Sequence, residues 1–258
     1  MMREQRSNKI IRRIKNNIYR KLRIHINYHK KPVAKEWFFK HAKRLNRFHN
    51  IHSKKSCFII GNGISLRNMD LSPLRDYYTF GLNKIHLIFD KVDLSLNYHV
   101  AVNKLVIEQS IDNFKAMNCP SFLSYNVIRN MQYCSDEKFY YLLTDGPYTF
   151  NKDITSPIHE GYTVTFVALQ IAYFMGFHNV YLIGVDHKFN FKGKPNEIKY
   201  MAGNDDNHFD QNYFKNKAWQ LPDLESAELS YHMARYYYNK ANRFIYDDTV
   251  DGKLDIFQ

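Results

Sequence analysis

The segment from residue 161 to residue 186 constrains the fold more than any other part of this 258-residue chain. An apolar run at 166–175 follows two threonines and stops at Gly176, which predicts a helix capped by a hydroxyl and closed by a glycine. The apolar run at 180–186 is typical of a strand buried on both faces of a parallel sheet. A helix joined by a short turn to such a strand is half of a βαβ crossover, so we expect an α/β fold.

Strand and helix patterns recur on both sides of this unit. We expect strands at 57–60, 78–83, 92–102 and 243–246, a helix from residue 104, and a helix at 225–239. Between the strand at 180–186 and residue 220 the chain is polar and irregular, which for a loop of this length indicates either a functional segment or disorder. These elements predict a Rossmann-like, mostly parallel sheet flanked by helices.

Polar or glycine residues stand where three of the expected strands end. Gly61-Asn62-Gly63 follows the first strand, Asn83 ends the second, and Asn103 follows the third. Open α/β sheets bind their ligands at this carboxyl edge, and a glycine turn lets backbone N–H groups approach a phosphate. The full G-x-G-x-x-G pattern is absent, because position 66 is leucine, and each asparagine is equally suited to capping a helix.

Positive charge is concentrated at the N-terminus. Residues 1–50 hold 16 of the 37 lysines and arginines but only two of the 25 acidic residues. Isoleucines recur at helical spacing within residues 8–27, which predicts a basic amphipathic helix. We therefore divide the chain into a basic helical extension, 1–50, and a catalytic domain, 51–258. The extension suits an anionic membrane surface, or packing on its own domain or on a second copy in a homo-oligomer. Nucleic acid is not expected as a partner, because no reader motif is present.

The cell compartment follows from what the sequence lacks. No apolar stretch reaches the ~20 residues of a membrane span, and no secretory signal is recognisable at the N-terminus. The three cysteines, Cys57, Cys119 and Cys134, are odd in number and widely spaced, so neither a disulfide framework nor a zinc site is expected. We expect a cytoplasmic protein, peripheral on the inner face of the cell membrane.

The ordered set of motifs resembles a known bacterial family. The set comprises Gly61-Asn62-Gly63-Ile64-Ser65-Leu66, Phe80-Gly81-Leu82-Asn83, Thr163-Val164-Thr165, and the strand that ends at Asp186. It resembles the domain of unknown function 115, which is similar to archaeal 6-hydroxymethylpterin diphosphokinase. The same motifs, in the same order, resemble the bacterial sialyltransferases of glycosyltransferase family 42. The resemblance covers roughly residues 57–258.

The sialyltransferase resemblance implies a function and a set of site residues. It implies inverting transfer from a CMP-activated 2-keto sugar acid, sialic acid-like or Kdo-like, without a metal or a cofactor. The donor-binding residues implied by position are Asn62, Gly63, Ser65, Asn83, Asn103, Thr163, Thr165 and Asp186, with Lys188 where the family has a tyrosine near the departing phosphate. His208 matches the general base, and an imidazole titrates in the range this role requires.

Four classes of function remain open at this level. The first is a glycosyltransferase of cell-surface glycan synthesis, with a nucleotide-sugar donor and a glycan acceptor. The second is an Mg²⁺-dependent diphosphokinase, for which Asp186, Asp205 and Asp206 are the candidate ligands. The third is another phosphate-linked transferase, and the fourth is a non-enzymatic nucleotide-binding assembly protein. The fold alone does not distinguish them.

Overall fold

The computed structural model describes residues 32–132 and 135–257, and the chain divides into two compact units, Met1–His41 and Ala42–Gln258. In the first unit, α2 (Pro32–Trp37) continues into a π-helical turn (Phe38–Ala42). The amphipathic helix expected at 8–27 lies outside the described residues. The second unit starts at Ala42, before the expected boundary at 50, because the chain at 42–50 already contributes to its core.

The aromatic ring of Phe48 shows why residues 42–50 belong to the second unit. Phe48 is the last residue of a short 3₁₀ helix (Asn46–Phe48), which directly follows α3 (Lys43–Leu45). Phe48 packs edge-on against Tyr140 and Phe122, with ring centroids 4.7 and 5.0 Å apart. Burying an aromatic side chain in this way contributes about 1.5–3 kcal/mol, so the segment is held by the same core as the sheet.

A seven-stranded, wholly parallel sheet forms the centre of the second unit, in the order β5-β4-β3-β2-β1-β6-β9. Its strands are β1 (Ser56–Ile60), β2 (Tyr78–Leu82), β3 (Tyr98–Ala101), β4 (Ser121–Ser124), β5 (Phe139–Leu142), β6 (Asn179–Ile183) and β9 (Phe244–Asp247). This confirms the Rossmann-like α/β fold. The strand order reverses between β1 and β6, the point where such sheets open a crevice for a ligand.

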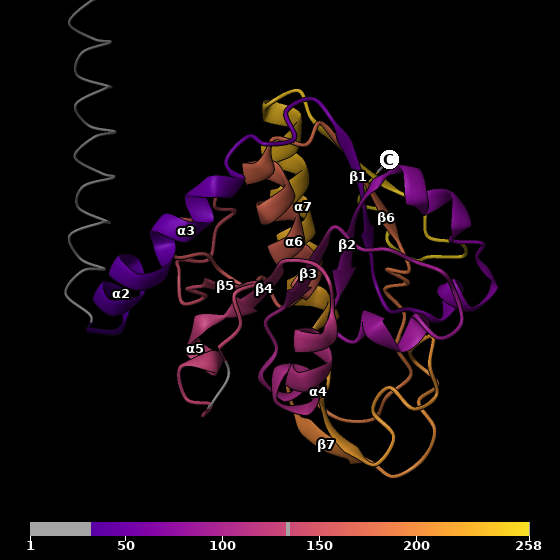
Figure 1. Cartoon of the computed structure of the whole chain (residues 1–258). Helices are drawn as coiled ribbons and strands as arrows, with labels where there is room; N and C mark the ends of the chain where they lie inside the picture. Colours follow the sequence, from indigo (N-terminus) through magenta and orange to yellow (C-terminus); the bar gives the residue numbers. More distant parts are fainter. Residues whose placement is uncertain (1–31, 133–134, 258) are drawn as a thin grey trace, which may run out of the picture. The chain divides into compact units, whose positions relative to one another are not determined.

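Helices cover both faces of the sheet. They are α4 (Lys104–Ala116), α5 (Tyr125–Ile128), α6 (Val164–Met175) and α7 (Leu224–Lys240). In α6 nearly every side chain is buried, and α7 packs beside it (Figure 1). The chain reverses its direction across the sheet after β5, so right-handed crossovers put α4 and α6 on opposite faces. The expected helix limits hold: Thr163 caps α6, and Gly176 ends it in the left-handed region, with φ +93°.

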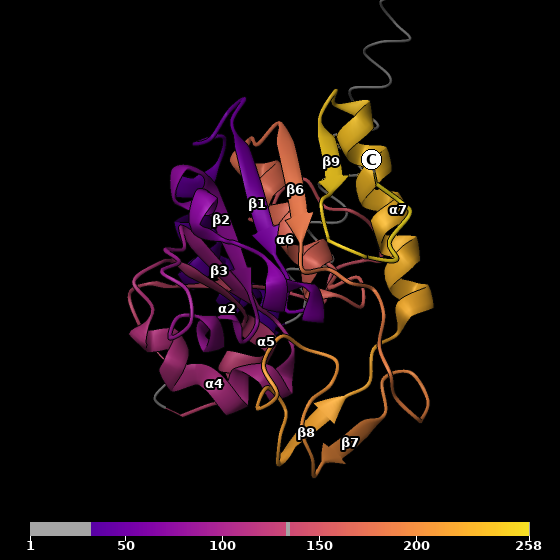
Figure 2. The same ribbon diagram turned by 90° about the vertical axis from the view of Figure 1, so that its right-hand side faces the viewer.

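The polar segment after β6 is more ordered than the sequence indicated. Within it, β7 (Ile198–Met201) and β8 (Lys217–Gln220) pair as an antiparallel hairpin. Figure 2 shows this hairpin beyond the arrowheads of β1 and β6, so it lies at the carboxyl edge of the sheet. In the part of the chain that the structure describes, no helix has the length and apolar character needed to cross a membrane.

Candidate functional site

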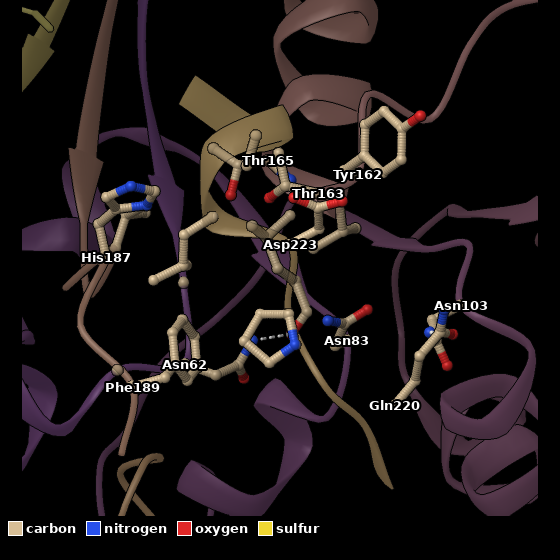
Figure 3. A pocket seen from close by; sticks show the side chains of 18 of the residues that line it. Asn62, Asn83, Asn103, Tyr162, Thr163, Thr165, His187, Phe189, Gln220 and Asp223 are labelled. Atoms are coloured by element: carbon tan, nitrogen blue, oxygen red, sulfur yellow. Dashed lines mark hydrogen bonds between the residues drawn. The ribbon is translucent and has the colours of Figure 1, made fainter. Parts of the chain in front are cut away.

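A cavity of about 480 Å³ opens at the carboxyl ends of β1, β2, β3 and β6, beside the first turn of α6 (Figure 3). The segment between β6 and α7 forms its other wall. Nine of the ten residues selected from the sequence line it: Asn62, Gly63, Asn83, Asn103, Thr163, Thr165, Asp186, Lys188 and His208. Ser65 is not among the lining residues.

The glycine turn is built differently from the expected phosphate cradle. It leads into a short 3₁₀ helix (Ile64–Asn68) and not into an α-helix. The backbone N–H and the hydroxyl of Ser65 both donate to the carboxylate of Asp186, the former at 3.0 Å. A Cβ at Gly63 would collide with the Asp186 side chain, and one at Gly61 would collide with the backbone of Gly184. These glycines therefore permit the close approach of β1 and β6, and Ser65 binds Asp186.

Two asparagine oxygens in the cavity have no hydrogen-bond partner in the described structure. The side chain of Asn62 donates from Nδ2 to the Leu82 oxygen at 2.9 Å, which fixes the orientation of its amide and leaves Oδ1 unpaired. The Oδ1 atom of Asn83 is likewise buried and unpaired. Both side chains lie in the cavity (Figure 3). A buried acceptor without a donor costs about 1–3 kcal/mol, so both oxygens are suited to a ligand that offers O–H or N–H groups.

Asn103 already has protein partners at both ends of its amide. Its Oδ1 accepts from the backbone N–H of Val106 at 3.2 Å and caps α4, while its Nδ2 donates to Gln220 at 2.9 Å (Figure 3). Of the two roles the sequence left open for this residue, capping is therefore the one its hydrogen bonds perform. The pair also ties α4 to β8 along one side of the cavity.

The turn before α6 brings a strained tyrosine to the rim of the cavity. Gly161 and Tyr162 both have positive φ, +62° and +61°, and Tyr162 lies beside Thr163 (Figure 3). Such a backbone costs about 1–3 kcal/mol for a residue other than glycine. His159 holds the turn, because its Nδ1 accepts from the Gly161 N–H at 2.9 Å. Sequence reasoning missed Tyr162, although its place between a glycine and a capping threonine was a usable signal.

His208 is fixed on one face and at one nitrogen. Its ring lies parallel to that of Tyr213 at 4.0 Å between centroids. Its Nδ1 is 2.8 Å from Oδ2 of Asp205, which is fully buried. Its Nε2 makes no hydrogen bond to any residue that the structure describes. A carboxylate on Nδ1 sets the tautomer in which Nε2 accepts a proton, so the arrangement is that of an oriented base facing a cavity.

The loop that carries His208 is tied to the glycine turn. The guanidinium of Arg67 donates to the main-chain oxygens of His208 and Phe209, at 2.8 and 3.1 Å. The Phe209 N–H donates in turn to the main-chain oxygen of Asn62 at 3.0 Å. The loop is thus fixed against the end of β1, and the imidazole stays within reach of the residues that follow the first strand.

The three aspartates considered as magnesium ligands do not form a cluster. Asp186 is held by Ser65, Asp205 is held by His208, and Asp206 is exposed. Across residues 32–132 and 135–257, no group of three His, Cys, Asp or Glu residues is arranged to hold a metal ion. Lys188 is exposed at the cavity wall, where it can reach a ligand as a mobile charge.

Glu160 is a second residue that sequence reasoning missed. It borders both the cavity and an adjoining hollow of about 520 Å³ at the ends of β3, β4 and β5. Burial raises the pKa of its carboxyl to about 7, although a hydrogen bond with Thr144 acts in the opposite direction. No periodicity or motif marked this glutamate, because its character comes from its surroundings.

The fold and the cavity thus define a Rossmann-like protein with a cavity at the switch point of its sheet. No protein-family model matches the chain, and no curated protein matches it. Among solved structures, it is similar to the MAf glycosyltransferase from Magnetospirillum magneticum AMB-1, with 11% sequence identity and a TM-score of 0.46. The match covers 83% of this chain and 36% of the other, so the chain spans about a third of that protein. A likeness of this size does not identify an activity.

Proposed function

We propose that the protein is a glycosyltransferase that moves a sugar from a nucleotide-activated donor, a CMP-linked 2-keto sugar acid, to a hydroxyl of a glycan acceptor. The observation that carries the proposal is the Asp205–His208 pair, whose histidine lines the same cavity as Asn62 and Asn83 with their unpaired oxygens. A base beside unpaired acceptors suits a substrate with many hydroxyl groups.

His208 acts as the general base in this reaction. Its Nε2 takes the proton of the acceptor hydroxyl as that oxygen attacks the anomeric carbon of the sugar. The new C–O bond forms on the face opposite the leaving group, and the bond from the anomeric carbon to the phosphate oxygen breaks. The electron pair leaves with CMP, and the configuration inverts. Asp205 stabilises the imidazolium that results.

The remaining lining residues suit the two parts of a nucleotide. Asn62 and Asn83 accept from sugar or ribose hydroxyls, because their free atoms are oxygens. The first turn of α6, entered through Thr163, offers backbone N–H groups and the positive end of the helix dipole to a phosphate. Lys188 adds a charge that neutralises the departing phosphate. Adjacent hollows that share Glu160 offer room for two substrates.

The partners and the location of the enzyme are part of the same proposal. A glycan acceptor is assembled at the inner membrane face, and residues 1–50 bring the enzyme to that anionic surface from the cytoplasm. Each Lys or Arg near such a surface contributes about 1 kcal/mol. Packing of this extension on a second copy of the chain is the alternative. Most of the extension lies outside the described residues, so its charge pattern is the support for this part.

A ligand screen by thermal shift tests the proposal and its rivals together. The panel is CMP, CDP, UDP, ATP and a 6-hydroxymethylpterin, each with and without Mg²⁺. The proposal predicts that CMP raises the melting temperature in the absence of Mg²⁺, since binding to the folded state stabilises it by mass action. A shift only with ATP or the pterin in Mg²⁺ would favour the diphosphokinase. No shift with any compound would contradict the proposal.

A further inference from the structure

Lys84 is a buried lysine beneath the loop that carries His208. It follows Asn83 directly at the end of β2, and it is only 1% exposed. Its ammonium donates to Oε1 of Gln109 on α4 and to the main-chain oxygen of Tyr213, both at 2.7 Å. It also lies 4.3 Å from the centre of the Phe214 ring. Among the described residues it makes no ion pair. Burying an ammonium without a directly bonded carboxylate is costly, so its retention here calls for a role.

The contacts of Lys84 fix Tyr213 at both ends. The ammonium binds the main-chain oxygen of Tyr213, and the backbone N–H of Lys84 donates to the Tyr213 hydroxyl at 3.3 Å. The Tyr213 ring is the surface on which the His208 imidazole lies, with an angle of 1° between the planes. The position of His208 over the cavity therefore depends on a tyrosine that Lys84 holds in place.

We propose that Lys84 is a positioning residue for the base: through Tyr213 it holds the His208 imidazole in its working orientation. This inference rests on the proposed function, since it requires His208 to act as the base. Lys84 lies outside the cavity lining, so the role does not involve contact with a substrate.

The charges around Lys84 connect it to the same pair. Burial, together with the nearby charge of Lys217, lowers its pKa to about 7, although the charge of Asp205 acts in the opposite direction. His86, which also feels Lys84 and Lys217, has a pKa lowered to about 4, chiefly by burial, and is neutral near pH 7. The role assigned to Lys84 is carried by its hydrogen bonds to Tyr213, at the main-chain oxygen and at the hydroxyl.

The test compares Lys84→Met with Lys91→Met. Lys91 bonds Asp210 on the outer side of the same loop and is half exposed, so it is a matched control. Lys84→Met should lower kcat by about 10- to 100-fold, because a base displaced by an ångström loses much of its effect. Affinity for the nucleotide should stay within about two-fold. Lys91→Met should change neither kcat nor the nucleotide affinity, because Lys91 bonds Asp210 and not Tyr213.

A second variant covers the case in which Lys84→Met does not fold. Tyr213→Leu removes the ring under His208 but leaves Lys84 in place, and should lower kcat as strongly. A folded Lys84→Met enzyme with parental kcat overturns the inference, even if its melting temperature falls. If Lys84→Met is unfolded, parental kcat in Tyr213→Leu overturns it. Full turnover in a His208 variant would instead refute the proposed function.

Discussion

The imidazole of His208 lies flat on the phenol ring of Tyr213, with centroids 4.0 Å apart and planes inclined by 1°. Asp205 holds the Nδ1 edge of the imidazole at 2.8 Å, so the edge that carries Nε2 is the part left to the cavity. A side chain fixed on one face and at one edge needs little reorganisation to take a proton. The predictions below test the consequences of this geometry.

Asp205→Asn should disable the base without removing it. An amide at this position can still bond Nδ1, but it can also donate, which permits the tautomer with its proton on Nε2. We expect kcat to fall by about 10²- to 10⁴-fold, the range typical for loss of general-base catalysis, and the affinity for CMP to stay within about two-fold. Asp206→Asn, at the exposed neighbouring position, is the control. Parental turnover in Asp205→Asn would contradict the role assigned to the pair.

The unpaired oxygen of Asn83 predicts a dependence on ligand hydroxyl groups. CMP and its 2′-deoxy and 3′-deoxy analogues should be compared by calorimetry in the parent and in Asn83→Leu. Loss of the hydroxyl that meets Oδ1 should cost the parent about 1 kcal/mol, roughly a five-fold change in affinity. Removal of the same hydroxyl should change the affinity of Asn83→Leu little. The difference between these two costs is the coupling between the hydroxyl and Asn83 that a double-mutant cycle measures.

Ser65→Ala is the control for that cycle. Ser65 binds Asp186 and does not line the cavity, so this variant should bind CMP within about two-fold of the parent and retain the hydroxyl dependence. If both deoxy analogues bind every variant as CMP does, the unpaired oxygen does not face the ribose.

Glu160→Gln should make stability less dependent on pH. Burial raises the pKa of the Glu160 carboxyl from 4.5 to about 7, so between these values the folded state binds a proton that the unfolded state has lost. The parent must therefore lose stability as pH rises through this window. Chemical unfolding at pH 4.5 and pH 8 should show that the free energy of unfolding of the parent falls by about 1–3 kcal/mol more than that of Glu160→Gln. A parent and a variant with parallel stability profiles would show that the carboxyl titrates normally.

The elements that local pattern controls were predictable from the sequence. The apolar run of α6, its threonine cap and its final glycine occur where expected, because each acts within a few residues along the chain. The convergence of Asn62 and Asn83 on one cavity also followed, since parallel strands end at a common edge, whereas His208 was selected only through the resemblance to the sialyltransferases.

The parts that long-range contacts decide were not predictable. Pairing of β7 with β8 joins residues such as Ile198 and Gln220, and neither segment alternates clearly enough to reveal it. The Ser65–Asp186 contact, which takes the place of the expected phosphate cradle, joins residues far apart in sequence. Glu160 and Lys84 owe their properties to burial, which composition does not show.

The most direct test of the central claim is single-turnover transfer by His208→Ala with a donor whose affinity has been measured. The account predicts that the affinity for the donor persists while the transfer rate falls by about 10²- to 10⁴-fold. It also predicts that the parental rate falls as the imidazole becomes protonated at low pH. A His208→Ala enzyme that binds the donor and transfers the sugar within a few-fold of the parental rate would contradict the claim that His208 is the base.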